Sequence, residues 1–175
     1  MCVFQQTGPE EWGSHPGSSA PVSPILALVG FIGLCLLVGG ADAALIERAV
    51  HTWFPSLTAP PATPPTWVFP PVWAALYVML GVAGWLVWRR SGAARPLRLW
   101  GWQLAANALW TPAFFGLRNP PLALAVIVVL LALIVVTMHS FVRLNRVAVW
   151  LMLPYLAWTG FVAYLNAGFW WLNAP

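Results

Sequence analysis

The sequence predicts an all-α integral membrane protein, a bundle of five transmembrane helices with a long Pro- and Trp-rich first loop. Of its 175 residues, 61% are hydrophobic and 7% are charged, whereas soluble domains carry about 25% charged residues. Five apolar segments follow one another, each close to the ~20 residues that cross the hydrocarbon core of a bilayer. They lack the strict alternation of barrel strands. Because a helix satisfies its own backbone hydrogen bonds in lipid, we expect these segments to be helices.

The first predicted helix runs from Pro24 to Leu45, because Ser23 can cap it and a proline suits the first turn. Residues 1–22 are rich in Gly, Pro and Ser and carry no positive stretch, so we expect a disordered tail rather than a signal peptide. A single membrane domain is expected over residues 23–175. The other four predicted helices are Pro70–Trp88, Leu97–Leu117, Pro121–Val142 and Val147–Leu172.

The connections between the predicted helices differ in length. Three are short enough for hairpins, so consecutive helices are expected to pack antiparallel. The first connection, Ile46–Phe69, is long and contains five prolines, which exclude a plain helix. Because long irregular loops in compact proteins are often functional, we expect this loop to act as a lid over one end of the bundle.

Arginine residues concentrate at one end of the predicted bundle. Six lie at that end and two at the other: Arg89, Arg90, Arg95, Arg98, Arg143 and Arg146 against Arg48 and Arg118. The positive-inside rule makes the first end cytoplasmic, so the N-terminus is inside, and the long loop and the C-terminus are outside. We expect the membrane to be a bacterial inner membrane. The net charge of +4 rests on these loop arginines and not on a basic groove, so nucleic acid is not an expected partner.

Aromatic and amide side chains converge in the central and outer part of the predicted bundle, where helical spacing places them on shared faces. The converging residues are Trp73, Tyr77, Asn107, Trp110, Trp158 and Asn166, with Gln103 on the same face of the third helix. This arrangement predicts an aromatic pocket with a few amides. Two plainer roles stay open. Trp and Tyr also gather at membrane interfaces as anchors, and Gln103 and Asn107 can serve as hydrogen-bonding groups between helices.

Asp42 is the only acid well inside a predicted span. It can pair with Arg48, extend to the membrane surface or contact a ligand. His139, near the inner end of the fourth helix, is expected to be solvated or hydrogen-bonded rather than a haem ligand. Cys35 is expected to be a small apolar filler. Since His and Cys are scattered along the chain, no metal site is expected.

The third predicted helix carries a face of small residues, Gly101, Ala105 and Ala108. Small residues let two helices approach closely in a membrane, where packing drives association. We therefore expect this face to form the contact between the two protomers of a homodimer.

Three blocks of the chain resemble signatures of the TspO/MBR family of translocator proteins and tryptophan-rich sensory proteins. The first block is Pro64–Trp73, followed by Tyr77. The second is Trp102–Gly116, and the third is Pro154–Trp158, followed by Leu165 and Asn166. With five spans and one long first loop, the resemblance covers about residues 24–173.

The resemblance implies a five-helix bundle, often dimeric, whose ligand cavity is closed by the first loop. Family members bind porphyrins such as protoporphyrin IX, and some bind sterols and benzodiazepine-type drugs. Bacterial members are linked to oxygen, light or stress responses and to tetrapyrrole handling, and some are reported to degrade porphyrin in light. The pocket residues that the motifs imply are Trp73, Asn107, Trp110 and Trp158, with Trp67, Tyr77, Gln103 and Leu165 beside them.

Two features depart from the family pattern. Ala62 stands where the family usually has a Trp just before the Pro-Pro of the loop, which removes one contact of the lid. No basic residue follows Arg146, so the sterol motif of the animal members, a Tyr followed closely by Lys or Arg, is incomplete. This second departure weighs against a sterol ligand.

We expect a membrane tetrapyrrole-binding sensor or regulator, with a porphyrin as ligand and no obligatory cofactor. Two alternatives stay open: a carrier of lipophilic ligands such as porphyrin or sterol, and an enzyme that degrades porphyrin with light and oxygen. Five spans cannot form the two equal inverted repeats that are common in carriers. The sequence has no conventional catalytic constellation, so any catalysis would use the photochemistry of the pigment, with Trp as electron donor.

Overall fold

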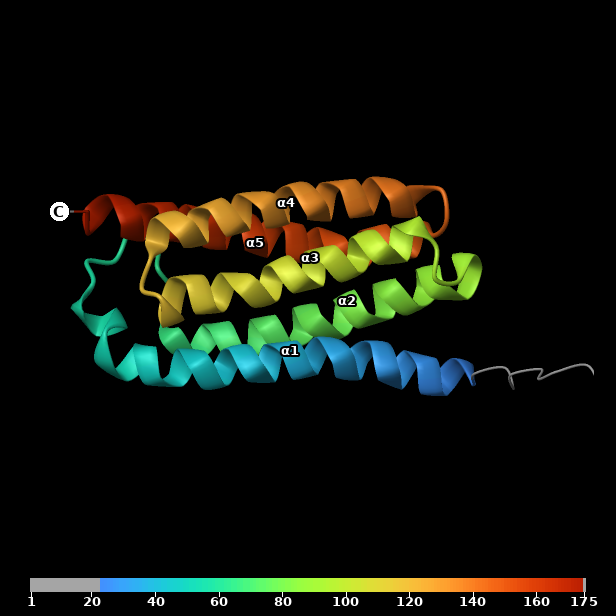
Figure 1. Ribbon diagram of the computed structural model, residues 1–175, viewed down its shortest axis with the longest axis horizontal. Coiled ribbons are helices and arrows are strands. Elements are labelled where there is room, and N and C mark those ends of the chain that lie inside the picture. The colour runs from blue at the N-terminus through green and yellow to red at the C-terminus, as the bar shows by residue number, and fades with distance from the viewer. Residues whose placement is uncertain (1–22, 175) are drawn as a thin grey trace, which may run out of the picture.

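The computed structural model describes residues 23–174, which form five long helices lying side by side (Figure 1). The helices are α1 (Pro24–Thr52), α2 (Phe69–Ser91), α3 (Arg95–Thr111), α4 (Pro120–Val142) and α5 (Arg146–Leu172). Helices α1 and α4 lie on opposite sides of the bundle in Figure 1, with α2, α3 and α5 between them. The predicted all-helical bundle is confirmed, whereas the expected tail, residues 1–22, lies outside the described residues.

Four of the described helices, α1, α2, α4 and α5, are long and apolar enough to cross a membrane. Helix α3 has 17 residues and continues directly into η3, a π-helical turn at Pro112–Gly116. The change of helix type falls at Pro112, which has no N–H to donate to the α-helical ladder. Together α3 and η3 run along the length of the bundle beside the other helices.

The first helix is longer than predicted. Helix α1 continues through Thr52, so the irregular connection begins at Trp53. The end of an apolar run marks where a chain leaves the hydrocarbon, but the charged residues that follow here are good helix formers and prolong the helix into water. The connection itself contains two short 3-10 turns, η1 (Phe54–Ser56) and η2 (Thr66–Val68).

Two glycines of α2 allow its close contact with neighbouring helices. A Cβ atom at Gly81 would lie 2.8 Å from the Cα atom of Ile32, so α2 touches the backbone of α1 at this point. A Cβ atom at Gly84 would lie 2.7 Å from Cε2 of Trp100, whose Nε1 donates a hydrogen bond to the carbonyl of Leu80 at 3.1 Å. These positions hold α2 against both α1 and α3.

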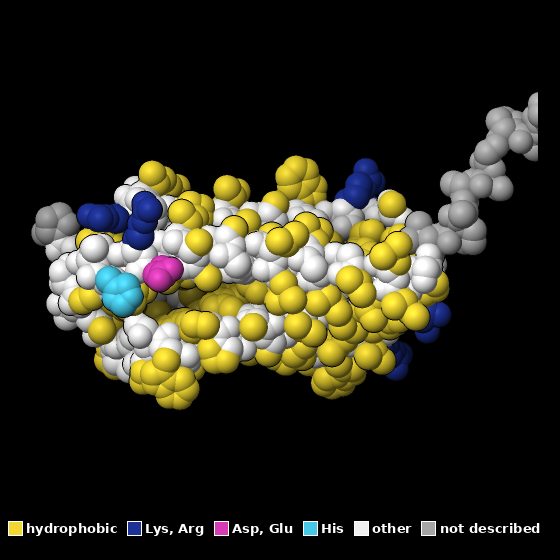
Figure 2. Space-filling view, turned by 90° about the horizontal axis from the view of Figure 1, so that it is seen from below, with side chains coloured by type: hydrophobic (Ala, Val, Ile, Leu, Met, Phe, Trp, Pro, Cys, Tyr) yellow, Lys and Arg dark blue, Asp and Glu magenta, His cyan; other side chains and the backbone are white. Residues whose placement is uncertain are grey.

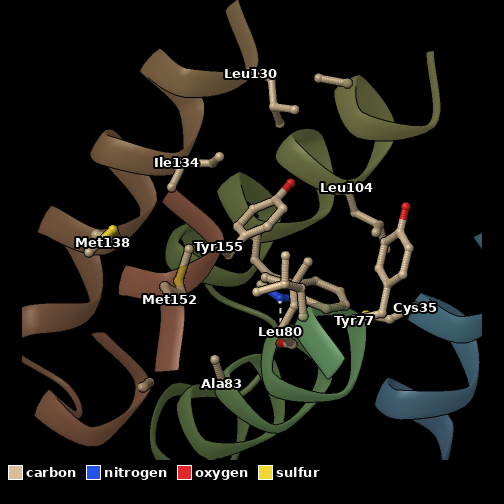
Figure 3. Packing of buried hydrophobic residues seen from close by; sticks show 14 of the residues in the cluster. Cys35, Tyr77, Leu80, Ala83, Leu104, Leu130, Ile134, Met138, Met152 and Tyr155 are labelled. Carbon is tan, nitrogen blue, oxygen red and sulfur yellow. Dashed lines mark hydrogen bonds between the residues drawn. The ribbon is translucent and has the colours of Figure 1, made fainter. Parts of the chain in front are cut away.

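The main apolar core runs along the bundle and draws on all five helices. Figure 3 shows part of it, with Cys35 of α1 beside the ring of Tyr77 and with Tyr155 among the side chains of α2, α3 and α4. Cys35 is fully buried. A second, smaller cluster forms around Phe114 and Phe169, where residues of the first loop pack on the bundle. This second cluster connects the loop to the helices that it covers.

Candidate ligand cavity

A cavity of about 660 Å³ lies toward the first-loop end of the bundle. Its walls come from α1, α2, α3, η3, α5 and the first loop. Figure 2 shows a hollow on the side of the molecule, lined by hydrophobic side chains, with an acidic and a histidine side chain at its rim. The volume falls within the ~300–1,000 Å³ that is usual for ligand sites.

Four buried polar side chains form a hydrogen-bonded chain at the cavity wall. The hydroxyl of Tyr77 lies 2.8 Å from Oδ1 of Asn107 and 3.1 Å from Oδ2 of Asp42. The Nδ2 group of Asn107 donates to the hydroxyl of Tyr155 at 2.8 Å. The chain therefore connects α1, α2, α3 and α5, and because its members are buried it also orients the polar part of the cavity.

Asp42 has a defined place in this chain. Its side chain is 8% exposed and lines the cavity, so it does not extend to the membrane surface. Arg48 is exposed and lies outside the lining, whereas the hydroxyls of Tyr77 and Thr111 lie beside the Asp42 carboxyl group. Of the three roles open from the sequence, the contact with a ligand is the one that this geometry allows. No helical spacing rule links residues 42 and 77, so the sequence could not show their pairing.

A second set of contacts fixes an aromatic wall of the cavity. The Nε1 group of Trp110 donates to Oδ1 of Asn166 at 3.0 Å, and Nδ2 of Asn166 donates to the carbonyl of Pro120 at 2.8 Å. The ring of Trp110 also stacks on that of Phe114, with centroids 5.6 Å apart and planes at 26°. Because both the ring and its N–H are held, Trp110 presents a fixed surface to the cavity.

Six of the eight predicted ligand-binding residues line the cavity: Trp67, Trp73, Tyr77, Asn107, Trp110 and Leu165. The structure does not bring the other two, Gln103 and Trp158, into the lining. Gln103 is fully buried one turn before Asn107, and neither of its amide atoms has a hydrogen-bond partner among residues 23–174. Trp158 packs edge-on against Phe69, with ring centroids 5.8 Å apart. Neither residue lines the cavity, and a part for them in ligand binding stays a prediction.

Several lining residues were missed because they lie beyond the predicted end of the first helix. Glu47 and His51 belong to the last turns of α1, and Phe54 belongs to η1. Ala43, Glu47 and His51 recur every four residues, so one helix face carries them all. Extending the helical period past the apolar run would have found this face.

The middle of the first loop is fastened to α5. Asn173 makes a reciprocal pair with Thr58: its Oδ1 accepts the Thr58 N–H at 2.8 Å, and its Nδ2 donates to the Thr58 carbonyl at 2.9 Å. Nearby, the hydroxyl of Tyr164 donates to the carbonyl of Pro61 at 3.2 Å. The 3-10 turns at both ends of the loop contribute to the cavity lining. The loop thus forms part of the cavity wall and is held in place by α5.

The small-residue face of α3 lies on the outside of the bundle. A Cβ atom at Gly101 would have nothing within 4 Å, and Ala105 is exposed. The neighbouring Trp102 and Leu109 are 67% and 61% exposed. The face is therefore accessible to a second copy, and the homodimer stays a prediction.

Metal binding has no candidate in the part of the chain that the structure describes. Residues 23–174 contain no group of three His, Cys, Asp or Glu side chains that could hold an ion. His139 is exposed at the end of α4 away from the cavity, so it does not take part in the site.

Comparisons with known proteins give one consistent result. The model of the TspO/MBR family matches residues 31–172. The tryptophan-rich protein TspO of Chlorobaculum tepidum is 38% identical over 146 residues, which cover 81% of this chain and 92% of that protein. The translocator protein of Bos taurus is 34% identical over 152 residues, covering 84% of this chain and 90% of that protein. The tryptophan-rich sensory protein of Cereibacter sphaeroides is 39% identical over 114 residues, covering 65% and 72%.

Proposed function

Because this chain belongs to the TspO/MBR family of integral membrane proteins, we propose that it is a membrane sensor that binds a porphyrin in the cavity described above. In this role, occupancy of the cavity by the pigment reports the state of tetrapyrrole metabolism under changing oxygen, light or stress. The relative from Cereibacter sphaeroides is named a tryptophan-rich sensory protein, which agrees with a sensory role.

The observation that carries this proposal is the aromatic lining of a cavity of about 660 Å³. Trp73 and Trp110 offer large flat faces, and a porphyrin is a flat apolar macrocycle that gains by stacking on them. The few polar groups, from Asp42 to Asn107, are of the kind that fix the orientation of a ligand in an otherwise apolar site. The first loop, held by α5, would retain the bound pigment.

The proposal includes a location and an orientation. We place the protein in a bacterial inner membrane with the first loop outside, because six arginines lie near the opposite end of the bundle and two near the loop end. In this orientation the cavity lies in the outer half of the bilayer. A porphyrin that enters it comes from the outer leaflet.

Titration of protoporphyrin IX into the detergent-solubilised protein, followed by the Soret band, tests the proposal. Replacing Trp73 or Trp110 with Ala should weaken binding roughly tenfold, because a lost aromatic partner costs about 0.5–1.5 kcal/mol beyond its area. Trp150 and Trp171 are 70% and 85% exposed and lie outside the cavity, so their Ala variants are the matched controls. A Trp73→Phe variant should keep much of the affinity, since Phe still offers a flat face.

Three results would contradict the proposal or redirect it. No saturable binding by the unmodified protein, or equal losses in all four Ala variants, would remove the cavity as the porphyrin site. Loss of pigment absorbance in light but not in the dark would favour the light-dependent enzyme. Flux of porphyrin into proteoliposomes that exceeds the flux into protein-free liposomes would favour the carrier.

A further inference from the structure

The cavity lining carries acidic side chains, whereas the net charge of the whole chain is positive. The chain carries a net charge of +4, yet no arginine or lysine is among the described residues that line the cavity. The ionisable side chains there are Asp42, Glu47, His51 and Tyr77. Two carboxyl groups therefore face this space, one deep in the wall and one at the exposed end of α1. A ligand with carboxylates gains no fixed cation from the wall.

The polar end of the cavity also has more acceptors than donors. The Tyr77 hydroxyl has one proton, but it lies at hydrogen-bond distance from two acceptors, Oδ2 of Asp42 and Oδ1 of Asn107. The Thr111 hydroxyl also lines this end of the cavity and can donate to Asp42, so two hydroxyl groups at most serve this carboxylate. A carboxylate can accept about four hydrogen bonds, which leaves Asp42 with further unused capacity. Buried acceptors of this kind favour a ligand that brings donors.

We propose that Asp42 anchors the ligand through a cationic or N–H donor group, so that the cavity prefers flat apolar ligands bearing such a group to the same ligands bearing carboxylates. This inference rests on the proposed role of the cavity as a porphyrin site and specifies the ligand chemistry. For a porphyrin with two carboxylates, it requires the carboxylate edge to point away from Asp42. A buried carboxylate next to a carboxylate would face like charge at low dielectric, which is strongly unfavourable.

The test compares ligands that share one ring system. Protoporphyrin IX, its neutral dimethyl ester and a bis-ammonium amide of the same porphyrin are titrated into the detergent-solubilised protein. The expected order of affinity is bis-ammonium, then ester, then dicarboxylate. A hydrogen bond to a buried charged group corresponds to roughly tenfold to hundredfold in affinity, so this ratio is expected between the ammonium and dicarboxylate ligands.

Two variants and one control test whether Asp42 causes the preference for ammonium over carboxylate ligands. Asp42→Asn keeps the size of the side chain and removes its charge, so the ratio of the affinities for the ammonium and the dicarboxylate ligand should fall toward one. Glu47→Gln removes the other carboxyl group, which is exposed, and should change the ratio less than about threefold because water screens it. Tyr77→Phe removes the hydroxyl that contacts Asp42 and should keep or increase the ratio. Circular dichroism and a single gel-filtration peak verify that each variant folds.

A dicarboxylate that binds more tightly than the ammonium ligand in the unmodified protein would overturn the inference, whatever the variants do. An unchanged ratio in Asp42→Asn, or a ratio near one in folded Tyr77→Phe, would also overturn it.

A second pair of ligands, 9-aminoacridine and acridine-9-carboxylate, separates this inference from the porphyrin proposal. If no porphyrin binds but the amine binds in an Asp42-dependent way, the porphyrin proposal fails and the anchor stands. If neither pair depends on Asp42, the anchor fails.

Discussion

Replacing Gly84 with Ala should destabilise the bundle by about 0.5–3 kcal/mol. The added Cβ atom would lie 2.7 Å from Cε2 and 3.0 Å from Nε1 of Trp100, whereas a favourable carbon contact is about 3.5–4.0 Å. Trp100 is 4% exposed, its ring contacts Phe31 with centroids 5.2 Å apart, and its N–H donates to Leu80. The ring therefore has no free space into which to move, and moving it disturbs that hydrogen bond.

The magnitude follows from opposing contributions. Overpacking costs about 1–3 kcal/mol, and weakening a hydrogen bond between membrane helices adds about 0.6 kcal/mol. Against these, Ala in place of Gly favours a helix by about 0.8–1.0 kcal/mol. The clash outweighs the gain in propensity, so the sum remains destabilising.

The assay is reversible unfolding in detergent micelles, followed by the helical circular dichroism signal. Gly160→Ala in α5 is the matched control, because its Cβ atom would meet nothing within 4 Å and only the helix propensity should act. We expect this control to be neutral or slightly stabilised. If Gly84→Ala is as stable as Gly160→Ala, the close packing of α2 on Trp100 does not stabilise the bundle.

Three further predictions concern the loop, the dimer and the topology. Asn173→Ala removes the pair that fastens the first loop to α5, so porphyrin should dissociate several-fold faster in stopped-flow displacement; an unchanged rate would show that the loop does not retain the ligand. Replacing both Gly101 and Ala105 with Leu should shift the particle toward monomer in light scattering, and an unchanged mass would move the interface elsewhere. Ser56→Cys should react with an impermeant thiol reagent added outside intact cells and Ser91→Cys should not, and the reverse pattern would invert the orientation.

The sequence predicted the positions of the helices better than their ends. Apolar runs identify the segments that cross hydrocarbon, and the starts of the five helices agree with them to within two residues. The apolar run predicts an end at Leu45, whereas α1 ends at Thr52. Hydropathy reports the solvent around a helix, whereas the helix ends where its backbone hydrogen bonds do, so the two boundaries need not coincide.

The candidate site was predicted in part, for a similar reason. Trp73, Tyr77, Asn107 and Trp110 could be grouped because each pair shares a helix face, and motif resemblance added Trp67 and Leu165. The place of Asp42 could not be predicted, because its contact with Tyr77 depends on how α1 packs on α2. Periodicity within one helix carries no information about the register between two helices.

The opening of the cavity on the side of the bundle has a consequence for how affinity should be expressed. The hollow in Figure 2 lies along the flank of the helices. In a bundle of membrane-spanning helices the flank is the surface that meets the acyl chains. A lipophilic ligand therefore partitions into the bilayer before it reaches the site, and occupancy follows its mole fraction in the lipid rather than its aqueous concentration. Dissociation constants referred to buffer will rise in proportion to the lipid or detergent present, while constants referred to mole fraction will stay fixed. In the proposed sensor role, occupancy of the cavity would report what the membrane has dissolved, and membrane volume would become a variable of the signal.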